Sequence, residues 1–198
     1  MKELNVASGG AWGGTNVDRA YMELLISIFG EDVIKRFKTE RRTDMLEFQR
    51  DFEMKKRTIR DRMGQNIRPV VISIPACLSE YVREMKGWSL ENAISNSEYA
   101  DKIKLKPGNK FAFARELMET LFQTTKEQIV QHVREILENQ DSENRISAIL
   151  MVGGFSTSNI IVDAIKEAFP DLRVVVPPEP GLAVVKGAVL YGHAPLTI

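Results

Sequence analysis

The stretch from Ile149 to Ser158 reads Ile-Leu-Met-Val-Gly-Gly-Phe-Ser-Thr-Ser. Its apolar first half predicts a buried strand from Ile146 to Val152, and its hydroxyl residues can cap the helix predicted from Ile160 to Phe169. A helix N-terminus beside paired glycines offers free backbone N–H groups and lets a ligand approach the backbone closely. On the residues alone, a phosphate or nucleotide contact and a plain strand-to-helix turn are about equally supported.

A second strand, Leu172 to Val176, and a second helix, Gly181 to Tyr191, follow this turn. Strands and helices that alternate with short connections predict a parallel α/β unit. Both strands are continuous apolar runs, which predicts that helices cover both faces of the sheet. The glycine turn is neither a Walker loop nor a Rossmann fingerprint, because neither glycine pattern occurs in the sequence.

Apolar residues at helical or alternating spacing predict the elements upstream of this unit. In chain order these are a helix from Val17 to Phe37 that Gly30 interrupts, a helix from Thr43 to Arg60, a strand from Ile67 to Pro75, short helices between Cys77 and Asp101, a strand from Lys102 to Lys106, and a long helix from Phe111 to Asn139. Pro69 predicts that the start of its strand lies at an edge of the sheet or outside it.

Basic and acidic residues are balanced, with 27 of each among 198 residues. Such a balance gives no general attraction to nucleic acid or to a membrane. The longest apolar runs are too short to span a bilayer, and the first residues lack the apolar core of a secretory signal. These features predict a cytoplasmic domain without a nucleic-acid or membrane partner.

The residues that could form a metal or nucleophilic site are few. The single cysteine, Cys77, excludes an intrachain disulfide and is expected to be a small buried residue rather than a nucleophile. His132 and His193 have no second histidine or cysteine at ligand spacing, so no zinc site is predicted. His132 is expected at the surface of its helix.

The segment from Gly9 to Gly14 reads Gly-Gly-Ala-Trp-Gly-Gly and precedes the first predicted helix. A hairpin turn is one interpretation, and a cradle of backbone amides for an anion is the other. A glycine-rich turn this close to Met1 also predicts that the chain is a fragment of a longer protein.

Three charged residues, Glu53, Lys56 and Arg57, stand at helical spacing and share one face of their predicted helix. A carboxylate beside two cations can bind ribose hydroxyls and flank a purine ring. An exposed ion pair, worth a few tenths of a kcal/mol, is the alternative. Without other context the ion pair is the favoured interpretation.

Taken in order, these elements resemble the second lobe of the nucleotide-binding domain of the heat-shock 70-kDa chaperones. The resemblance rests on Gly-Gly-x-x-x-Asp at 13–18, Glu-x-x-Lys-Arg at 53–57, Val-Gly-Gly at 152–154 and the proline-led Gly-Ala helix at 177–191. The motifs at the two ends of the chain are most similar to the divergent heat shock 70 kDa protein 12 branch of that family.

The resemblance implies an α/β fold, an actin-like (ribonuclease H-like) ATPase lobe with a helix-rich α+β insertion subdomain. It implies that residues 1–18 and 140–198 form the core subdomain and residues 19–139 the insertion. It further implies that the first lobe and the peptide-binding domain of the family are absent from this chain, so that the chain does not hydrolyse ATP alone.

The resemblance also assigns a ligand, ATP or ADP, whose magnesium would be held mainly by the first lobe. Co-chaperones or client proteins are the implied protein partners. The implied nucleotide contacts are Gly13 and Gly14 near the phosphates, Glu53, Lys56 and Arg57 on the adenosine side, Gly153, Gly154, Phe155 and Ser156 at the base and sugar, and Gly181 close by.

Two departures from the family pattern leave an alternative open. Phe155 stands where the family usually has serine, and Pro180-Gly181 replaces its usual aspartate. A non-catalytic protein-interaction module that retains the actin-like fold would explain both changes. A sugar kinase-like enzyme of the same superfamily is a third interpretation, but no residue can be assigned as its aspartate base.

Overall fold

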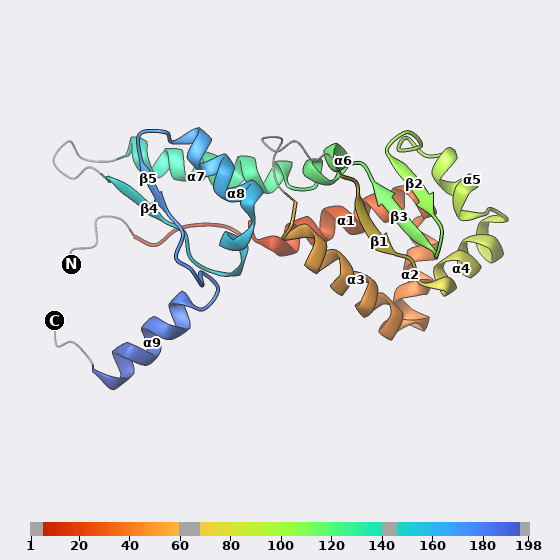
Figure 1. Ribbon diagram of the computed structural model, residues 1–198, viewed down its shortest axis with the longest axis horizontal. Coiled ribbons are helices and arrows are strands. Elements are labelled where there is room, and N and C mark those ends of the chain that lie inside the picture. The colour runs from red at the N-terminus through yellow and green to blue at the C-terminus, as the bar shows by residue number, and fades with distance from the viewer. Residues whose placement is uncertain (1–5, 60–67, 140–145, 195–198) are drawn as a thin grey trace. The chain divides into compact units, whose positions relative to one another are not determined.

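The computed structural model describes residues 6–59, 68–139 and 146–194 (Figure 1). Its contacts divide the chain into two compact units. The N/C unit combines Met1–Gly14 with Thr124–Ile198, and the middle unit is Thr15–Gln123. Both units mix helices and strands, which agrees with the predicted α/β class. The element ends predicted at Arg60 and Ile67 lie outside the described residues.

The middle unit is a helical layer around a small antiparallel sheet. Its helices are α1 (Gly14–Phe29), α2 (Glu31–Glu40), α3 (Arg42–Lys56), α4 (Ala76–Lys86), α5 (Leu90–Ser95) and α6 (Arg115–Thr120), and its strands are β1 (Val70–Ser73), β2 (Ile103–Lys106) and β3 (Lys110–Phe113). The strand order is β1-β3-β2. β1 is therefore an edge strand that begins just after Pro69, as the proline predicts.

Gly30 separates α1 from α2, as the sequence predicts. Its φ of 93° is one that side-chain-bearing residues rarely adopt. A Cβ added there would also lie 2.7 Å from Oδ1 of Asp32. The chain can therefore turn between the two helices only because this residue is a glycine.

Aromatic side chains fill the core of the middle unit. Tyr21 of α1 stacks on Phe52 of α3, with ring centroids 3.9 Å apart and planes 6° from parallel. Phe113 of β3 meets the same tyrosine edge-on, with centroids 6.0 Å apart. These contacts join α1, α3 and the sheet into one core and fix where the C-terminal end of α3 lies relative to α1.

The long helix predicted from Phe111 to Asn139 is wrong at its start and in its continuity. Residues Lys110–Phe113 form β3, the central strand, and two helices, α6 and then α7 (Gln123–Glu138), occupy most of the remaining range. Lys106 and Lys110 face each other across a short turn in which Gly108 and Asn109 have positive φ. This hairpin starts β3, and burial of Phe113 in the sheet outweighs its helical spacing with Leu117 and Leu121.

The N/C unit contains the strand–helix–strand–helix series that the sequence predicts. Its elements are α7 (Gln123–Glu138), β4 (Ala148–Leu150), the 3-10 turn η1 (Gly154–Thr157), α8 (Asn159–Ala168), β5 (Arg173–Val175) and α9 (Ala183–His193). β4 and β5 pair in parallel, with Ile149 opposite Val174. α8 packs by its apolar face, where Ile160, Ile161 and Ile165 are buried.

The prediction that helices cover both faces of this sheet is wrong for the described residues. Ala148 and Leu150 are exposed, the latter at 64%, whereas Ile149 between them is half-buried. Side chains alternate between the faces of a strand, so one face of β4 is open. α9 is also open, since none of its residues is buried. Within the described ranges no helix is long and apolar enough to cross a membrane.

Candidate functional site

The turn after β4 is built from two glycines with different tasks. Gly153 has φ 91° and ψ 166°, a conformation that is essentially restricted to glycine. η1 then begins at Gly154, and a Cβ added to either glycine would meet nothing within 4 Å. The backbone of this turn is therefore open to a ligand that makes contact with main-chain atoms.

Hydroxyl side chains hold the turn rather than cap the helix that follows. Ser156 Oγ donates to the carbonyl oxygen of Val152 at 2.8 Å, and Thr157 Oγ1 donates to that of Gly154 at 2.7 Å. Ser158 is the N-cap residue of α8, but its side chain makes no capping bond. The predicted hydroxyl cap is thus wrong. Ser156 is buried and its hydroxyl is committed to the turn.

A second backbone turn lies against the first. The amide of Gly153 donates a 2.8 Å hydrogen bond to the carbonyl oxygen of Pro180. A Cβ added to Gly181 would lie 3.6 Å from the Cα of Gly154. The structure thus brings Gly153, Gly154 and Gly181 together in the N/C unit, and Phe155 beside them is half-buried.

The charged face at the end of α3 is an ion-pair network. Lys56 is only 5% exposed, and its Nζ lies 2.5 Å from Oδ1 of Asp18 and also pairs with Glu53. Arg57 Nη2 lies 2.8 Å from Oε1 of the same glutamate. Sequence reasoning missed Asp18 as a member of this cluster, although it ends the Gly-Gly-x-x-x-Asp motif that carries part of the resemblance.

The carboxylate of Glu53 stays ionised in this network. Burial alone would raise the pKa of Glu53, but hydrogen bonds from Lys56 and Arg57 outweigh the burial and lower it. An ionised carboxylate offers acceptor oxygens only, which suits hydroxyl donors such as those of a ribose.

A cavity of about 270 Å³ adjoins the network, between α1 and α3. Its walls combine carboxylates, apolar side chains and one guanidinium; the lining residues are Asp18, Tyr21, Met22, Leu46, Gln49, Arg50, Phe52 and Glu53. Its volume is just below the range of roughly 300–1,000 Å³ common for small-molecule pockets. A flat, partly polar group could enter it and reach the Glu53 carboxylate.

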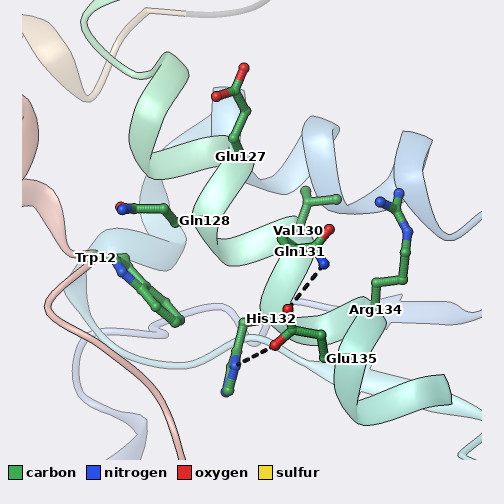
Figure 2. A pocket seen from close by; sticks show the side chains of 8 residues that line it. All are labelled: Trp12, Glu127, Gln128, Val130, Gln131, His132, Arg134 and Glu135. Atoms are coloured by element: carbon green, nitrogen blue, oxygen red, sulfur yellow. Dashed lines mark hydrogen bonds and ion pairs between the residues drawn. The ribbon is translucent and has the colours of Figure 1, made fainter. Parts of the chain in front are cut away.

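The glycine segment, residues 8–14, runs along α7 in the N/C unit. Figure 2 shows Trp12 of this segment beside His132 of α7, in a groove of about 550 Å³. His132 lies at the surface, as predicted, but the groove leaves only 23% of its side chain exposed. Gly13 and Gly14 follow Trp12, are half-buried, and lead directly into α1.

The sequence-predicted site residues therefore fall into two sets. Glu53, Lys56 and Arg57 belong to the middle unit. The other set belongs to the N/C unit and consists of Gly13, Gly14, Gly153, Gly154, Phe155, Ser156 and Gly181.

The remaining predictions concern metal-binding side chains and Cys77. Among the described residues, no group of three or more histidine, cysteine, aspartate or glutamate side chains is arranged to hold a metal ion. Cys77 is buried, as predicted, and its Sγ lies 3.3 Å from Oδ2 of Asp44. Burial and this carboxylate raise the pKa of the Cys77 thiol to about 11.

Comparison with known proteins identifies relatives along the whole chain. Heat shock 70 kDa protein 12B of Homo sapiens is 35% identical over 197 residues, which are 98% of this chain and 28% of that protein. Heat shock 70 kDa protein 12A of Homo sapiens and of Mus musculus is 31% identical over 199 residues, 100% of this chain and 29% of each relative. No family model and no solved structure matches. The chain thus spans less than a third of the length of these relatives.

Proposed function

Because this chain is a relative of the heat shock 70 kDa protein 12 branch along its whole length, we propose that it forms one lobe of an actin-like nucleotide-binding domain. Each unit offers its own contacts to ATP or ADP: the N/C unit offers backbone atoms of its glycine turns, and the middle unit offers the charged end of α3. Phosphoryl transfer depends on groups that surround the phosphates from both sides, so one lobe binds nucleotide without turning it over.

The observation that supports this proposal most directly is the contact between the Gly153–Gly154 turn and Gly181. Two main-chain turns meet with a hydrogen bond of 2.8 Å, and no side chain would crowd a Cβ at Gly153 or Gly154. An adenosine group can lie flat against such a surface, because the backbone there presents no protruding side chain.

The middle unit supports the proposal with the Glu53 carboxylate. Its pKa is lowered, so it is available as a hydrogen-bond acceptor at neutral pH. It lines the cavity between α1 and α3 together with Asp18. Lys56 contributes by holding both carboxylates in place, since its own Nζ is committed to them.

Calorimetric titration of the 198-residue chain with MgADP and MgATP tests the proposal. A single lobe should bind with a Kd of roughly 0.1–1 mM, equivalent to about −4 to −5.5 kcal/mol. Phosphate release from ATP should not exceed the rate of the uncatalysed reaction.

A matched pair of glycine substitutions identifies the binding surface. Gly181→Val places branched carbons against Gly154 and should abolish the titration signal. Gly187→Val lies on exposed α9, where an added Cβ meets nothing within 4 Å, and should leave binding unchanged. Absence of binding by the unsubstituted chain, or equal loss in both variants, would contradict the proposal and favour the interaction module.

A further inference from the structure

One imidazole contacts the glycine segment at two points. Nε2 of His132 lies 3.2 Å from Oγ of Ser8. The same ring meets the indole of Trp12 edge-on, with centroids 5.1 Å apart and planes at 61° (Figure 2). Ser8 and Trp12 flank the three residues Gly9, Gly10 and Ala11, so a single side chain of α7 contacts the chain on both sides of them.

The segment is shaped for this contact. The backbone amide of Trp12 donates a 2.9 Å hydrogen bond to the carbonyl oxygen of Gly10, which folds the chain back on itself. A Cβ on Gly10 would lie 2.4 Å from Cε2 of the Trp12 indole. The indole therefore reaches His132 only because residue 10 has no side chain.

The imidazole is itself oriented from within α7. Its Nδ1 lies 3.9 Å from Oε2 of Glu135, and Gln131 donates a 3.0 Å hydrogen bond to the other oxygen of that carboxylate. Glu127 and Arg134 are the other charged residues that line the groove. The glycine segment, residues 8–14, contains no charged side chain, so its contact with His132 depends on ring packing and one hydrogen bond.

We propose that His132 is a positioning residue for the phosphate end of the nucleotide. It acts through Ser8 and Trp12, and Trp12 directly precedes Gly13 and Gly14. An unrestrained glycine-rich segment has many backbone conformations, and ordering it on binding costs affinity. His132 holds the segment in place before ligand arrives, which removes part of that cost. This inference rests on the proposed nucleotide function.

The test compares two ligands, ADP and adenosine, and three variants of the full chain. His132→Ala and Trp12→Leu should weaken ADP binding about five- to tenfold. In these variants the phosphate-contacting glycines become ordered only when ADP binds, and that loss of conformational entropy reduces the affinity. Adenosine has no phosphate, so its affinity should not change. His193→Ala is the matched control: it removes the other histidine, which is exposed on α9, and should alter neither affinity.

Two further measurements separate positioning from general destabilisation. His132→Gln can still offer a side-chain nitrogen to Ser8 and should restore part of the ADP affinity. Amide hydrogen exchange of residues 8–14, measured without ligand, should be about tenfold faster in His132→Ala than in the unsubstituted chain, with α8 unchanged.

The outcomes distinguish this inference from the proposed function. Unchanged exchange of residues 8–14 in His132→Ala overturns the anchoring role, whatever the nucleotide result. Faster exchange with an unchanged ADP-to-adenosine affinity ratio overturns the link to the phosphates. If the unsubstituted chain binds neither ligand, the proposed function fails and the phosphate role of His132 fails with it, while the exchange data still decide the anchor.

Discussion

Lys56 of α3 reaches across to Asp18 of α1, with its Nζ 2.5 Å from Oδ1 of the aspartate. The lysine side chain is 7% exposed, whereas the aspartate is 40% exposed and Glu53, its second partner, 39%. The cation is therefore buried beneath two carboxylates that water still reaches. This arrangement makes Lys56 a structural element of the same cluster in which the family resemblance implies an adenosine contact.

Replacing Lys56 by Met should lower the free energy of unfolding by roughly 1–3 kcal/mol. Breaking a fully buried pair costs about 3–5 kcal/mol, and the partial exposure of both carboxylates reduces that figure. Urea unfolding followed by circular dichroism measures the loss. Arg57→Gln is the control, because its pair with Glu53 is exposed and should contribute at most about 1 kcal/mol. Equal losses of unfolding free energy in the two variants would contradict the structural role of Lys56.

Gly153→Ala should destabilise the chain by about 1–3 kcal/mol, because φ near 91° strains any residue with a Cβ. Gly154→Ala is its neighbour and control: an added Cβ there meets nothing within 4 Å, and its φ is not positive. Thermal unfolding of both variants checks the difference. A larger loss of stability in Gly154→Ala than in Gly153→Ala would contradict the backbone conformation described for this turn.

The stability of the fold should decrease at acidic pH as Glu53 becomes protonated. Its pKa is lowered from the ordinary 4.5 in the folded chain, so its charged form stabilises the fold above that value. This contribution should decline as pH falls below about 4.5 and through the lowered pKa. Urea unfolding at pH 7, 4.5 and 3 should show that the gap between the unsubstituted chain and Glu53→Gln closes toward acid. A gap that is constant with pH would refute the role of ionisation.

Cys77 should react slowly with a thiol reagent at pH 8 in the folded chain. Burial and the Asp44 carboxylate raise its pKa to about 11, and only the thiolate is nucleophilic. Asp44→Asn removes the second of these causes and should speed the reaction. Ellman's reagent measures both rates, with the chain unfolded in guanidinium as the reference. A folded rate as fast as the unfolded one would show that the thiol is not protected.

The raised pKa of Cys77 also determines how the stability of the fold should change at alkaline pH. The thiol stays protonated in the folded chain up to about pH 11, whereas in the unfolded chain it ionises near its ordinary value of 9.0. The stabilisation from the protonated thiol is therefore present below pH 9 and is lost progressively as pH rises from 9 to 11. Cys77→Ser should flatten that part of the stability profile.

Much of the fold could be predicted from local sequence signals. Gly30 marks a helix break because its backbone conformation excludes other residues, and Pro69 marks an edge because it cannot donate to a ladder. β3 was missed because Phe113 also stands at helical spacing from Leu117 and Leu121, whereas the strand alternation of Phe111 and Phe113 covers only three residues. The Gly108–Asn109 pair was the available signal, as a dipeptide typical of tight hairpins.

The candidate site was predictable in its parts but not in its contacts. The glycines at 153 and 154 stand out in sequence because they interrupt an apolar run before a helix. Nothing in the sequence indicates that Gly153 bonds to Pro180, since that contact depends on how the chain returns after β5. The burial of Lys56 and the pairing of Trp12 with His132 were likewise missed, because both join residues far apart in the chain.

The open surface of α9 has a thermodynamic consequence. Val184, Val189 and Leu190 are already 54–71% exposed in the folded chain. Unfolding this helix therefore brings little new apolar surface into contact with water. Both the heat-capacity change and the denaturant slope grow with newly exposed area, so α9 adds little to either. The heat-capacity change and the urea slope of this chain will therefore say little about whether α9 is folded.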